Sequence, residues 1–212
     1  MQKNIVIFGG SFDPIHKGHI MLVKQMFNNL VDIDKFYIIP TGTNLAYKKH
    51  LFSDQERLFM LKSCFNLLSD NDLNIFPQIP EEQNFVYEFY HPNIVISDLE
   101  LNNSEVSYTI DTINYIKKIH PHKTIHLLIG SDQATNFSKW HCVQDLVQLI
   151  TLWTYPRKGF KLDPNYQWNI IDFEEQNISS SIIRDILYNN DSLEHEFIPE
   201  SISVLAKLFF DK

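Results

Sequence analysis

Two histidines, His16 and His19, stand three residues apart shortly after a glycine pair, Gly9-Gly10, in the stretch GGSFDPIHKGH. Glycines at a strand end let the backbone turn tightly and come close to a ligand. The start of the helix that follows offers free amide groups to an anion. Residues one helical turn apart share a face, so both imidazoles would meet the same ligand. The stretch is therefore predicted to form a phosphate cradle with two donors beside it.

Phosphoryl or nucleotidyl transfer is the chemistry that this arrangement suits. Negative charge builds on the nonbridging and leaving-group oxygens during such a transfer, and positioned donors lower the barrier. A dinucleotide-dehydrogenase or P-loop function loses its main support, because the stretch is neither G-x-G-x-x-G nor a P-loop lysine motif. A zinc site would need a third ligand, and none stands at the H-E-x-x-H positions.

A second group of phosphate-binding residues lies near the C-terminus, in ISSSIIR. Three consecutive serines, 179–181, bring hydroxyls and backbone amides to a helix start, and Arg184 adds a fork suited to phosphate oxygens. Plain helix capping is the alternative that the serines leave open when taken alone.

Short apolar runs alternate with longer amphipathic segments along the chain. This order favours an α/β fold with a parallel sheet. One helix has its own start signal, the capping-box spacing of Ser53 and Glu56, and Pro199 is expected in the first turn of the last helix. The pattern predicts strands at 4–8, 35–39, 95–101, 126–130 and 151–155, and helices at about 18–30, 54–68, 111–119, 142–149 and 200–210.

The segment 77–93, PQIPEEQNFVYEFYHPN, interrupts this alternation with three prolines and several aromatic residues. A surface hairpin packed on its own aromatic side chains is one interpretation. A lid or a subunit contact is the other.

Composition limits the class of protein. The 212 residues, 44% of them hydrophobic, suffice for one sizeable core, and the chain is expected to form a single domain over 1–212. The net charge of −8 argues against a broad nucleic-acid or membrane-surface footprint. No apolar stretch reaches the roughly 20 residues of a membrane span, and the N-terminus lacks a signal-type pattern, so a cytoplasmic location is predicted. Cys64 and Cys142 are expected to be reduced packing residues.

GGSFDPIHKGH resembles the first signature of the HxGH nucleotidyltransferase superfamily, and ISSSIIR is similar to its second, ISSTxxR. The resemblance implies a Rossmann-like α/β fold, a doubly wound parallel sheet flanked by helices, with a small C-terminal helical segment. It also implies transfer of a nucleotidyl group from a nucleoside triphosphate to a phosphate or similar nucleophile, with release of pyrophosphate. SYTIDT at 107–112, LIGSD at 128–132 and KWH at 139–141 resemble elements of the bacterial nicotinate-nucleotide adenylyltransferases.

The resemblance implies roles for individual residues. His16 and His19 would contact the ATP phosphates and stabilise the transition state, with Arg184 as a third catalytic residue. Backbone groups around Tyr108 and Thr109 would take the nicotinate carboxylate. The implied ATP-binding residues are Gly9, Gly10, Ser11, Phe12, Gly18, Lys48, Gly130, Asp132, Ser180 and Ser181, and the implied mononucleotide-binding residues are Tyr108, Thr109, Asp111 and Trp140.

Two of these residues could serve the fold alone. Trp140, implied to stack on the pyridine ring, could equally belong to the core, and Asp111 could be only a helix-start residue. Asp132, implied with Gly130 to meet the adenosine ribose, fits the rule that α/β sheets bind ligands at the carboxyl ends of their strands.

Two departures from the family pattern stand out. Ser181 replaces the usual threonine and keeps the hydroxyl. The loop 40–50, PTGTNLAYKKH, stands where the family usually has a PPHK-type stretch. Only the lysines survive clearly there, so Lys48 is carried over as a phosphate contact, with a solvated surface lysine as the alternative.

The implied substrates are ATP and nicotinate mononucleotide, with Mg²⁺ bound together with ATP and no metal site of the protein's own. Nucleic acid and membrane partners are not expected, and self-association is left open. An adenylyltransferase acting on nicotinamide mononucleotide or another acceptor, and a nucleotide-binding regulator without catalysis, are the alternative functions. Because both substrates are anions, an acidic chain must concentrate cations at the site, and those expected there are Lys17, Lys48, Lys49, Arg157 and Arg184.

Overall fold

A computed structural model describes residues 3–42, 49–79, 85–101, 106–155, 157, 159–172, 178–189 and 197–211. The described residues form a six-stranded sheet in the order β3-β2-β1-β4-β5-β6, in which every neighbouring pair is parallel. The strands are β1 (Asn4–Gly10), β2 (Ile33–Pro40), β3 (Ile94–Ile96), β4 (Thr124–Gly130), β5 (Ile150–Tyr155) and β6 (Asn169–Ile170).

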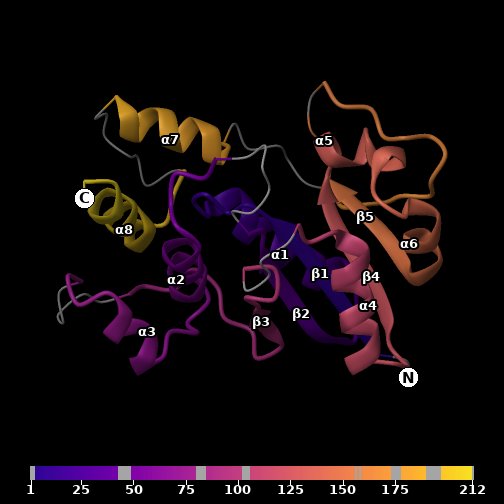
Figure 1. Cartoon of the computed structure of the whole chain (residues 1–212), viewed down its shortest axis with the longest axis horizontal. Coiled ribbons are helices and arrows are strands. Elements are labelled where there is room, and N and C mark those ends of the chain that lie inside the picture. Colours follow the sequence, from indigo (N-terminus) through magenta and orange to yellow (C-terminus); the bar gives the residue numbers. More distant parts are fainter. Residues whose placement is uncertain are drawn as a thin grey trace.

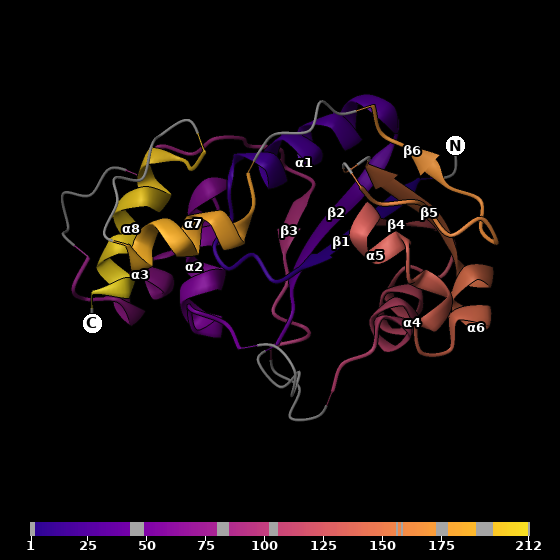
Figure 2. The same ribbon diagram turned by 90° about the horizontal axis from the view of Figure 1, so that it is seen from above.

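Helices cover both faces of the sheet (Figures 1 and 2). One face carries α1 (Lys17–Asn29), α2 (Asp54–Cys64), α7 (Ser180–Tyr188) and α8 (Glu200–Phe210), and the other carries α4 (Thr109–Ile119) and α6 (Val143–Leu149). The shorter helices are α3 (Asp70–Ile75), α5 (Ser131–Ala134) and the 3-10 turn η1 (Phe137–Lys139).

The alternation of side chains along β1 explains why two layers of helices are needed. Val6 and Phe8 belong to the hydrophobic cluster beneath α1, α2, α7 and α8, whereas Ile5 and Ile7 belong to the cluster beneath α4 and α6. Successive residues of a strand point to opposite faces, so a strand that is apolar at every position must be covered on both sides. The predicted α/β fold, Rossmann-like and doubly wound, is confirmed.

The order of the strands fixes where a ligand can bind. From β1 the chain runs outward through β2 to β3, and it then returns to place β4 on the other side of β1. A sheet of this kind opens a crevice outside the carboxyl ends of the two strands where the order reverses. Gly9-Gly10 ends β1 and Gly130 ends β4, so these glycines lie at that crevice.

Most elements predicted from the sequence are present. The capping box at the start of α2 is formed, since Glu56 accepts hydrogen bonds from the backbone N–H of Ser53 (2.8 Å) and from its hydroxyl (2.9 Å). Helix α2 ends at Cys64 rather than 68, and the strand predicted at 95–101 covers only Ile94–Ile96. Pro199 stands at the N-cap of α8 rather than in its first turn.

The prediction of a hairpin at 77–93 is wrong for the part that the structure describes. Residues 85–93 contain no strand, and Phe85 and Phe89 pack against the main core cluster instead of against each other. The backbone N–H of Glu88 donates to the carbonyl of Cys64 at 3.0 Å, which ties this segment to the end of α2. Residues 80–84 lie outside the described part of the chain, and a lid or subunit contact stays a prediction.

The two cysteines, both expected to be packing residues, differ in their burial. Cys64 is buried as expected, but Cys142 is exposed, because it stands outside the core at the N-cap of α6 with a φ of 50°. Among the described residues, no helix combines the length and the apolar character that a membrane crossing requires.

Candidate functional site

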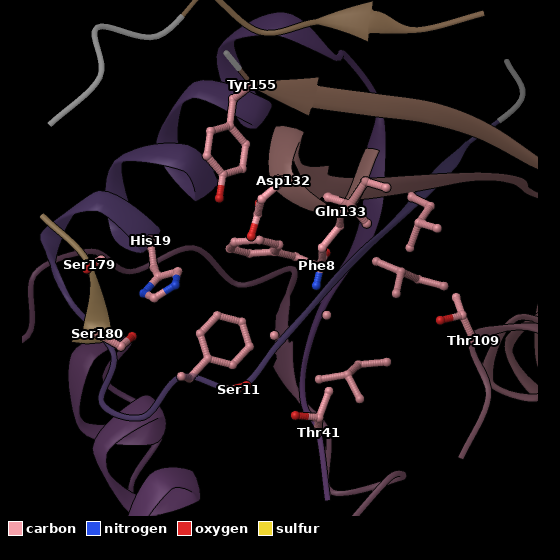
Figure 3. A pocket seen from close by; sticks show the side chains of 18 of the residues that line it. Phe8, Ser11, His19, Thr41, Thr109, Asp132, Gln133, Tyr155, Ser179 and Ser180 are labelled. Atoms are coloured by element: carbon pink, nitrogen blue, oxygen red, sulfur yellow. The ribbon is translucent and has the colours of Figure 1, made fainter. Parts of the chain in front are cut away.

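A cavity of about 380 Å³ opens at the carboxyl ends of β1 and β4 (Figure 3). His19, Ser179 and Ser180 lie on one side of it and Thr109 lies on the opposite side. The sequence-predicted residues that line it are Gly9, Gly10, Ser11, Phe12, His16, His19, Thr109, Gly130, Asp132, Trp140, Ser180, Ser181 and Arg184.

Four of the predicted site residues are not among the lining residues. Gly18 lies behind His16, and an added Cβ would stand 3.1 Å from the imidazole Nδ1. The absence of a side chain at Gly18 therefore leaves room for the His16 ring. Tyr108 is exposed and stacks on His141 with ring centroids 4.2 Å apart, and Asp111 is exposed in the first turn of α4. Lys48 lies outside the described residues.

The turn after β1 holds its shape through Phe12. This residue has a φ of 45°, the left-handed conformation, which reverses the chain sharply after Gly10. Its ring is buried and packs edge-on against Phe8 (5.4 Å) and against His19 (4.9 Å). The backbone of the turn therefore faces the cavity, while the ring of Phe12 packs against His19 and supports it.

The two histidines form a stacked pair at the start of α1. Their ring centroids are 3.7 Å apart, with an angle of 29° between the rings. The backbone N–H of His16 donates to Nδ1 of His19 at 3.3 Å. Because Nδ1 accepts, the neutral ring carries its proton on Nε2, and His19 offers this N–H as a donor.

Burial keeps both imidazoles neutral. Removal from water, and to a smaller extent the guanidinium charge of Arg157, together lower the pKa of His19 to about 3. The pKa of His16 is lowered well below its ordinary value, first by burial and then by His19 and Arg157. In the free protein the pair therefore acts as neutral hydrogen-bond donors at physiological pH and not as two imidazolium cations.

This neutrality gives a prediction for pH dependence. In the unfolded chain both rings would take up protons below about pH 6.5, whereas His19 in the folded chain does so only near pH 3. The folded state thus binds fewer protons in this window, and its stability falls as the pH is lowered from 6.5 towards 3. In ¹⁵N NMR spectra, the ring signals of His16 and His19 should stay in the neutral form down to pH 5, while free histidine in the same tube titrates. A midpoint above pH 6 for both rings would contradict their burial.

The start of α7 closes the cavity beside the histidines. The hydroxyl of Ser179 caps the helix by accepting from the backbone N–H of Ile182 (3.3 Å), and the hydroxyl of Ser180 donates to the carbonyl of Pro14 at 3.0 Å. Arg184 donates to the carbonyl of Asp13 at 2.7 Å and to the hydroxyl of Ser181 at 3.0 Å. These bonds hold the two predicted phosphate-binding motifs on one cavity wall. Along the chain the motifs are far apart, with 167 positions from Asp13 to Ser180.

The end of β4 forms the next wall. A side chain at Gly130 would collide with the carboxylate of Asp132, so only glycine lets this carboxylate stand over the strand end. Asp132 lies 3.5 Å from Arg157, whose guanidinium lies 5.4 Å from the ring centroid of Tyr155. The pairing leaves Asp132 as a hydrogen-bond acceptor at the strand end, which suits a ribose hydroxyl.

The wall around Thr109 differs from the phosphate side. Trp140 packs against Phe137, with ring centroids 5.0 Å apart, and also lines the cavity, so its packing role is confirmed and its stacking on the pyridine ring stays a prediction. Glu100 accepts a hydrogen bond from the hydroxyl of Thr112 at 2.8 Å, and burial raises the pKa of its carboxyl. An aromatic face beside few charges can hold a flat ring.

Sequence reasoning missed several lining residues. Thr41 follows the end of β2, Tyr155 ends β5, and Gln133 follows Asp132. Glu100 lies in the turn before α4. The signal that could have found Thr41 and Tyr155 is their place at strand ends, since parallel strands all end at one edge of the sheet.

The expected concentration of cations is met in part. Arg157 and Arg184 line the cavity, whereas Lys17 and Lys49 are not among its lining residues. In a chain with a net charge of −8, these two arginines bring positive charge to the cavity, although Asp132 lies 3.5 Å from Arg157 and Asp13 lies 3.5 Å from Arg184.

Comparison with known proteins gives a consistent match. The family model described as cytidylyltransferase-like matches residues 7–186. A protein of Nitratiruptor sp. named probable nicotinate-nucleotide adenylyltransferase is 32% identical over 85% of this chain and 86% of its own length. A protein of Oceanobacillus iheyensis with the same name is 28% identical over 95% of this chain and 92% of its own.

Solved structures agree on the fold. The Plasmodium falciparum nicotinic acid mononucleotide adenylyltransferase, solved in complexes with APC and with NaAD, superposes with a TM-score of 0.70 at 24% identity. The superposition covers 99% of this chain and 98% of that one.

Proposed function

Because the chain belongs to the cytidylyltransferase-like family, and to the nicotinate-nucleotide adenylyltransferases within it, we propose that it makes nicotinate adenine dinucleotide from nicotinate mononucleotide and ATP. This is an adenylyl transfer of NAD biosynthesis. The observation that carries the proposal is the joining of two phosphate-directed motifs on one cavity wall, through Arg184 to Asp13 (2.7 Å) and Ser180 to Pro14 (3.0 Å).

The reaction is a displacement at the α-phosphorus of ATP. An oxygen of the mononucleotide phosphate forms a new bond to this phosphorus, the bond to the β-phosphate oxygen breaks, and pyrophosphate leaves with the electron pair. The nucleophile is already an anion, so the chain needs no general base and forms no covalent intermediate. Alignment of the two phosphates can supply roughly 7–11 kcal/mol of the barrier reduction.

The cavity walls fit the parts of the two substrates. Neutral N–H donors of His16 and His19 would meet charge that develops on the transferred phosphate. Arg184 and the start of α7 suit the departing β- and γ-phosphates, since a helix N-terminus and an arginine fork both favour phosphate oxygens. Asp132 would accept from the adenosine ribose, and the face of Trp140 would pack against the pyridine ring.

Mg²⁺ is proposed to enter with ATP. Within the described ranges, no three His, Cys, Asp or Glu side chains gather in a way that could hold a metal ion. At nucleotides, Mg²⁺ is usually held by substrate phosphates, waters and one or two carboxylates, so it does not require a dedicated cage of three or more protein ligands. When bound, the ion would neutralise charge on the phosphates, while the arginines do so from the protein side.

Acceptor preference tests the proposed substrate. We expect rapid pyrophosphate release with Mg-ATP and nicotinate mononucleotide, and much slower release with nicotinamide mononucleotide or phosphopantetheine, with the dinucleotide identified by mass. A preference for the amide would keep the chemistry and change the specificity. ATP binding without pyrophosphate release in any of the three mixtures would instead indicate a regulator.

The proposed enzyme is one nucleotidyltransferase domain over residues 1–212. It acts on small molecules in the cytoplasm and not on nucleic acid or membranes. Self-association stays open, and Lys48 remains a proposed phosphate contact.

A further inference from the structure

Helix α2 approaches the phosphate-binding turn from outside the cavity, and one residue makes the contact. The side chain of Arg57 is fully buried, with 0% exposure. Its Nη1 donates to the carbonyl of Ser11 at 2.6 Å, and its Nη2 donates to the carbonyl of Thr41 at 2.7 Å and to the carboxylate of Asp54 at 2.5 Å. A single guanidinium thus joins the turn after β1 to the residue after β2.

The two carbonyls belong to residues that line the cavity, whereas Arg57 is not among the lining residues. A trans peptide is planar, with its C=O and N–H pointing in opposite directions. When the carbonyl of Ser11 points back to Arg57, the N–H of Phe12 must point away from it, towards the cavity side of the turn. By the same geometry, the N–H of Gly42 points away from Arg57.

The segment that leads into α2 holds the turn at a second place. The carboxylate of Asp13 accepts from the backbone N–H of Leu51 (2.9 Å) and from that of Phe52 (2.9 Å). Asp13 is itself buried, and its carbonyl is the acceptor for Arg184. The turn between Ser11 and Asp13 is therefore fixed at two places, by the guanidinium of Arg57 at Ser11 and by the bonds of the Asp13 carboxylate to the segment before α2.

A purely structural role explains this arrangement poorly. A buried ion pair adds little stability over apolar residues of the same volume, because desolvation offsets the attraction. Within the described residues, Nε of Arg57 has no hydrogen-bond partner, so the site does not satisfy the guanidinium fully. What an apolar side chain could not do is set the orientation of two peptide groups at once.

We propose that Arg57 is a positioning residue for the adenylyl transfer: it turns the Ser11–Phe12 peptide so that the Phe12 N–H faces the bound phosphates, and it fixes the end of β2 against the same turn. The inference rests on the proposed function. Backbone donors stabilise a transition state only if they are oriented before the reaction, and an error of about 1 Å can cost about 10²-fold in rate.

Arg57→Lys separates position from charge. Lysine keeps the positive charge beside Asp54, but its single nitrogen cannot reproduce a planar fork that binds two carbonyls from two nitrogens. Lys62→Met is the matched control: Lys62 lies on the same helix, forms a 2.5 Å ion pair with Asp72, and is not among the cavity-lining residues.

We expect Arg57→Lys to lower kcat by about tenfold or more and to raise the Kd for α,β-methylene-ATP by about threefold, with a melting temperature close to that of Lys62→Met. Arg57→Ala should regain activity with millimolar guanidinium ion and not with methylammonium, since only guanidinium restores the fork. A purely structural residue would show neither the kcat loss in folded protein nor this selective rescue.

The outcomes separate the two proposals. If the unmodified protein releases no pyrophosphate, the proposed function fails, and the α,β-methylene-ATP affinities still report the orientation of the turn. If the unmodified protein is active and Arg57→Lys matches Lys62→Met in kcat and Kd, the positioning role is overturned. A kcat loss that only follows the unfolded fraction would also overturn it.

Discussion

Replacing His19 with alanine is expected to lower kcat by about 10²–10³-fold while the affinity for ATP changes by less than about threefold. The bond between the N–H of His16 and Nδ1 of His19 (3.3 Å) leaves the proton of His19 on Nε2. A neutral donor of this kind gains most when charge builds on the phosphate during the reaction. Loss of one such donor in a site closed to water costs about 10²–10³-fold in turnover.

Two further variants make this test specific. His19→Asn keeps an N–H donor on a shorter side chain and should retain more activity than His19→Ala. His126→Gln is the control, because His126 is also a buried histidine, with a pKa lowered by burial to about 4, but it is bonded to Trp153 at 2.9 Å and does not line the cavity. Steady-state kinetics and ATP titration calorimetry give the two quantities. An unchanged kcat in His19→Ala would remove His19 from the catalytic residues.

The parts of the fold that the sequence predicted are those with a local cause. The strand β1 is apolar at consecutive positions and ends in two glycines, and the start of α2 has a complete capping box. Helix α3 was missed because its six residues are too few to show a helical period, and β6 was missed because it has only two residues. The strand β6 depends on pairing with β5, which comes earlier in the chain, whereas α3 has its own capping box and is tied to α2 by the ion pair of Asp72 with Lys62.

The residues of the site divide in the same way, into those that a local motif marks in the sequence and those that only the fold brings to the cavity. His16, His19 and the serines at the start of α7 could be found because a local motif carries each of them. Glu100 and Tyr155 could not, since they meet the cavity only through the order of the strands and the turn before α4. Arg57 is the extreme case, because its partners at Ser11 and Thr41 lie 46 and 16 residues away in the chain.

The wrong expectation for the segment 77–93 has a physical reason of its own. The segment 77–93 was expected to pack on its own aromatics because composition cannot show which rings find space in a larger core. Phe85 lies 5.7 Å from Phe59 of α2, with the two rings edge to face, so the core absorbs it. Val86, Tyr87 and Tyr90 remain exposed, so a partner could reach these apolar and aromatic side chains of the segment.

Arg184→Ala is expected to lower kcat/KM for ATP by about 10²–10³-fold. Its guanidinium spans from the carbonyl of Asp13 (2.7 Å) to the hydroxyl of Ser181 (3.0 Å), where both motifs meet the cavity. Hydrogen bonds to a charged group contribute roughly 1.5–3 kcal/mol each, and every 1.4 kcal/mol corresponds to about tenfold. Two bonds from Arg184 to phosphate oxygens would therefore account for a loss of this size.

The loss has to be separated from an effect on stability. The Arg184 side chain is 25% exposed, but its partner Asp13 is buried, so truncation removes a donor from a buried carbonyl and a modest decrease in melting temperature is expected beside the loss of kcat/KM. Arg184→Lys keeps a point charge without the fork, so its kcat/KM should lie between those of Arg184→Ala and the unmodified protein. Lys207 is an exposed cation of α8, and Lys207→Ala should have the kcat/KM of the unmodified protein. If Arg184→Ala retained its kcat/KM, the start of α7 would not hold the phosphates, and its bonds to Asp13 and Pro14 would serve only to attach the C-terminal helices to the sheet.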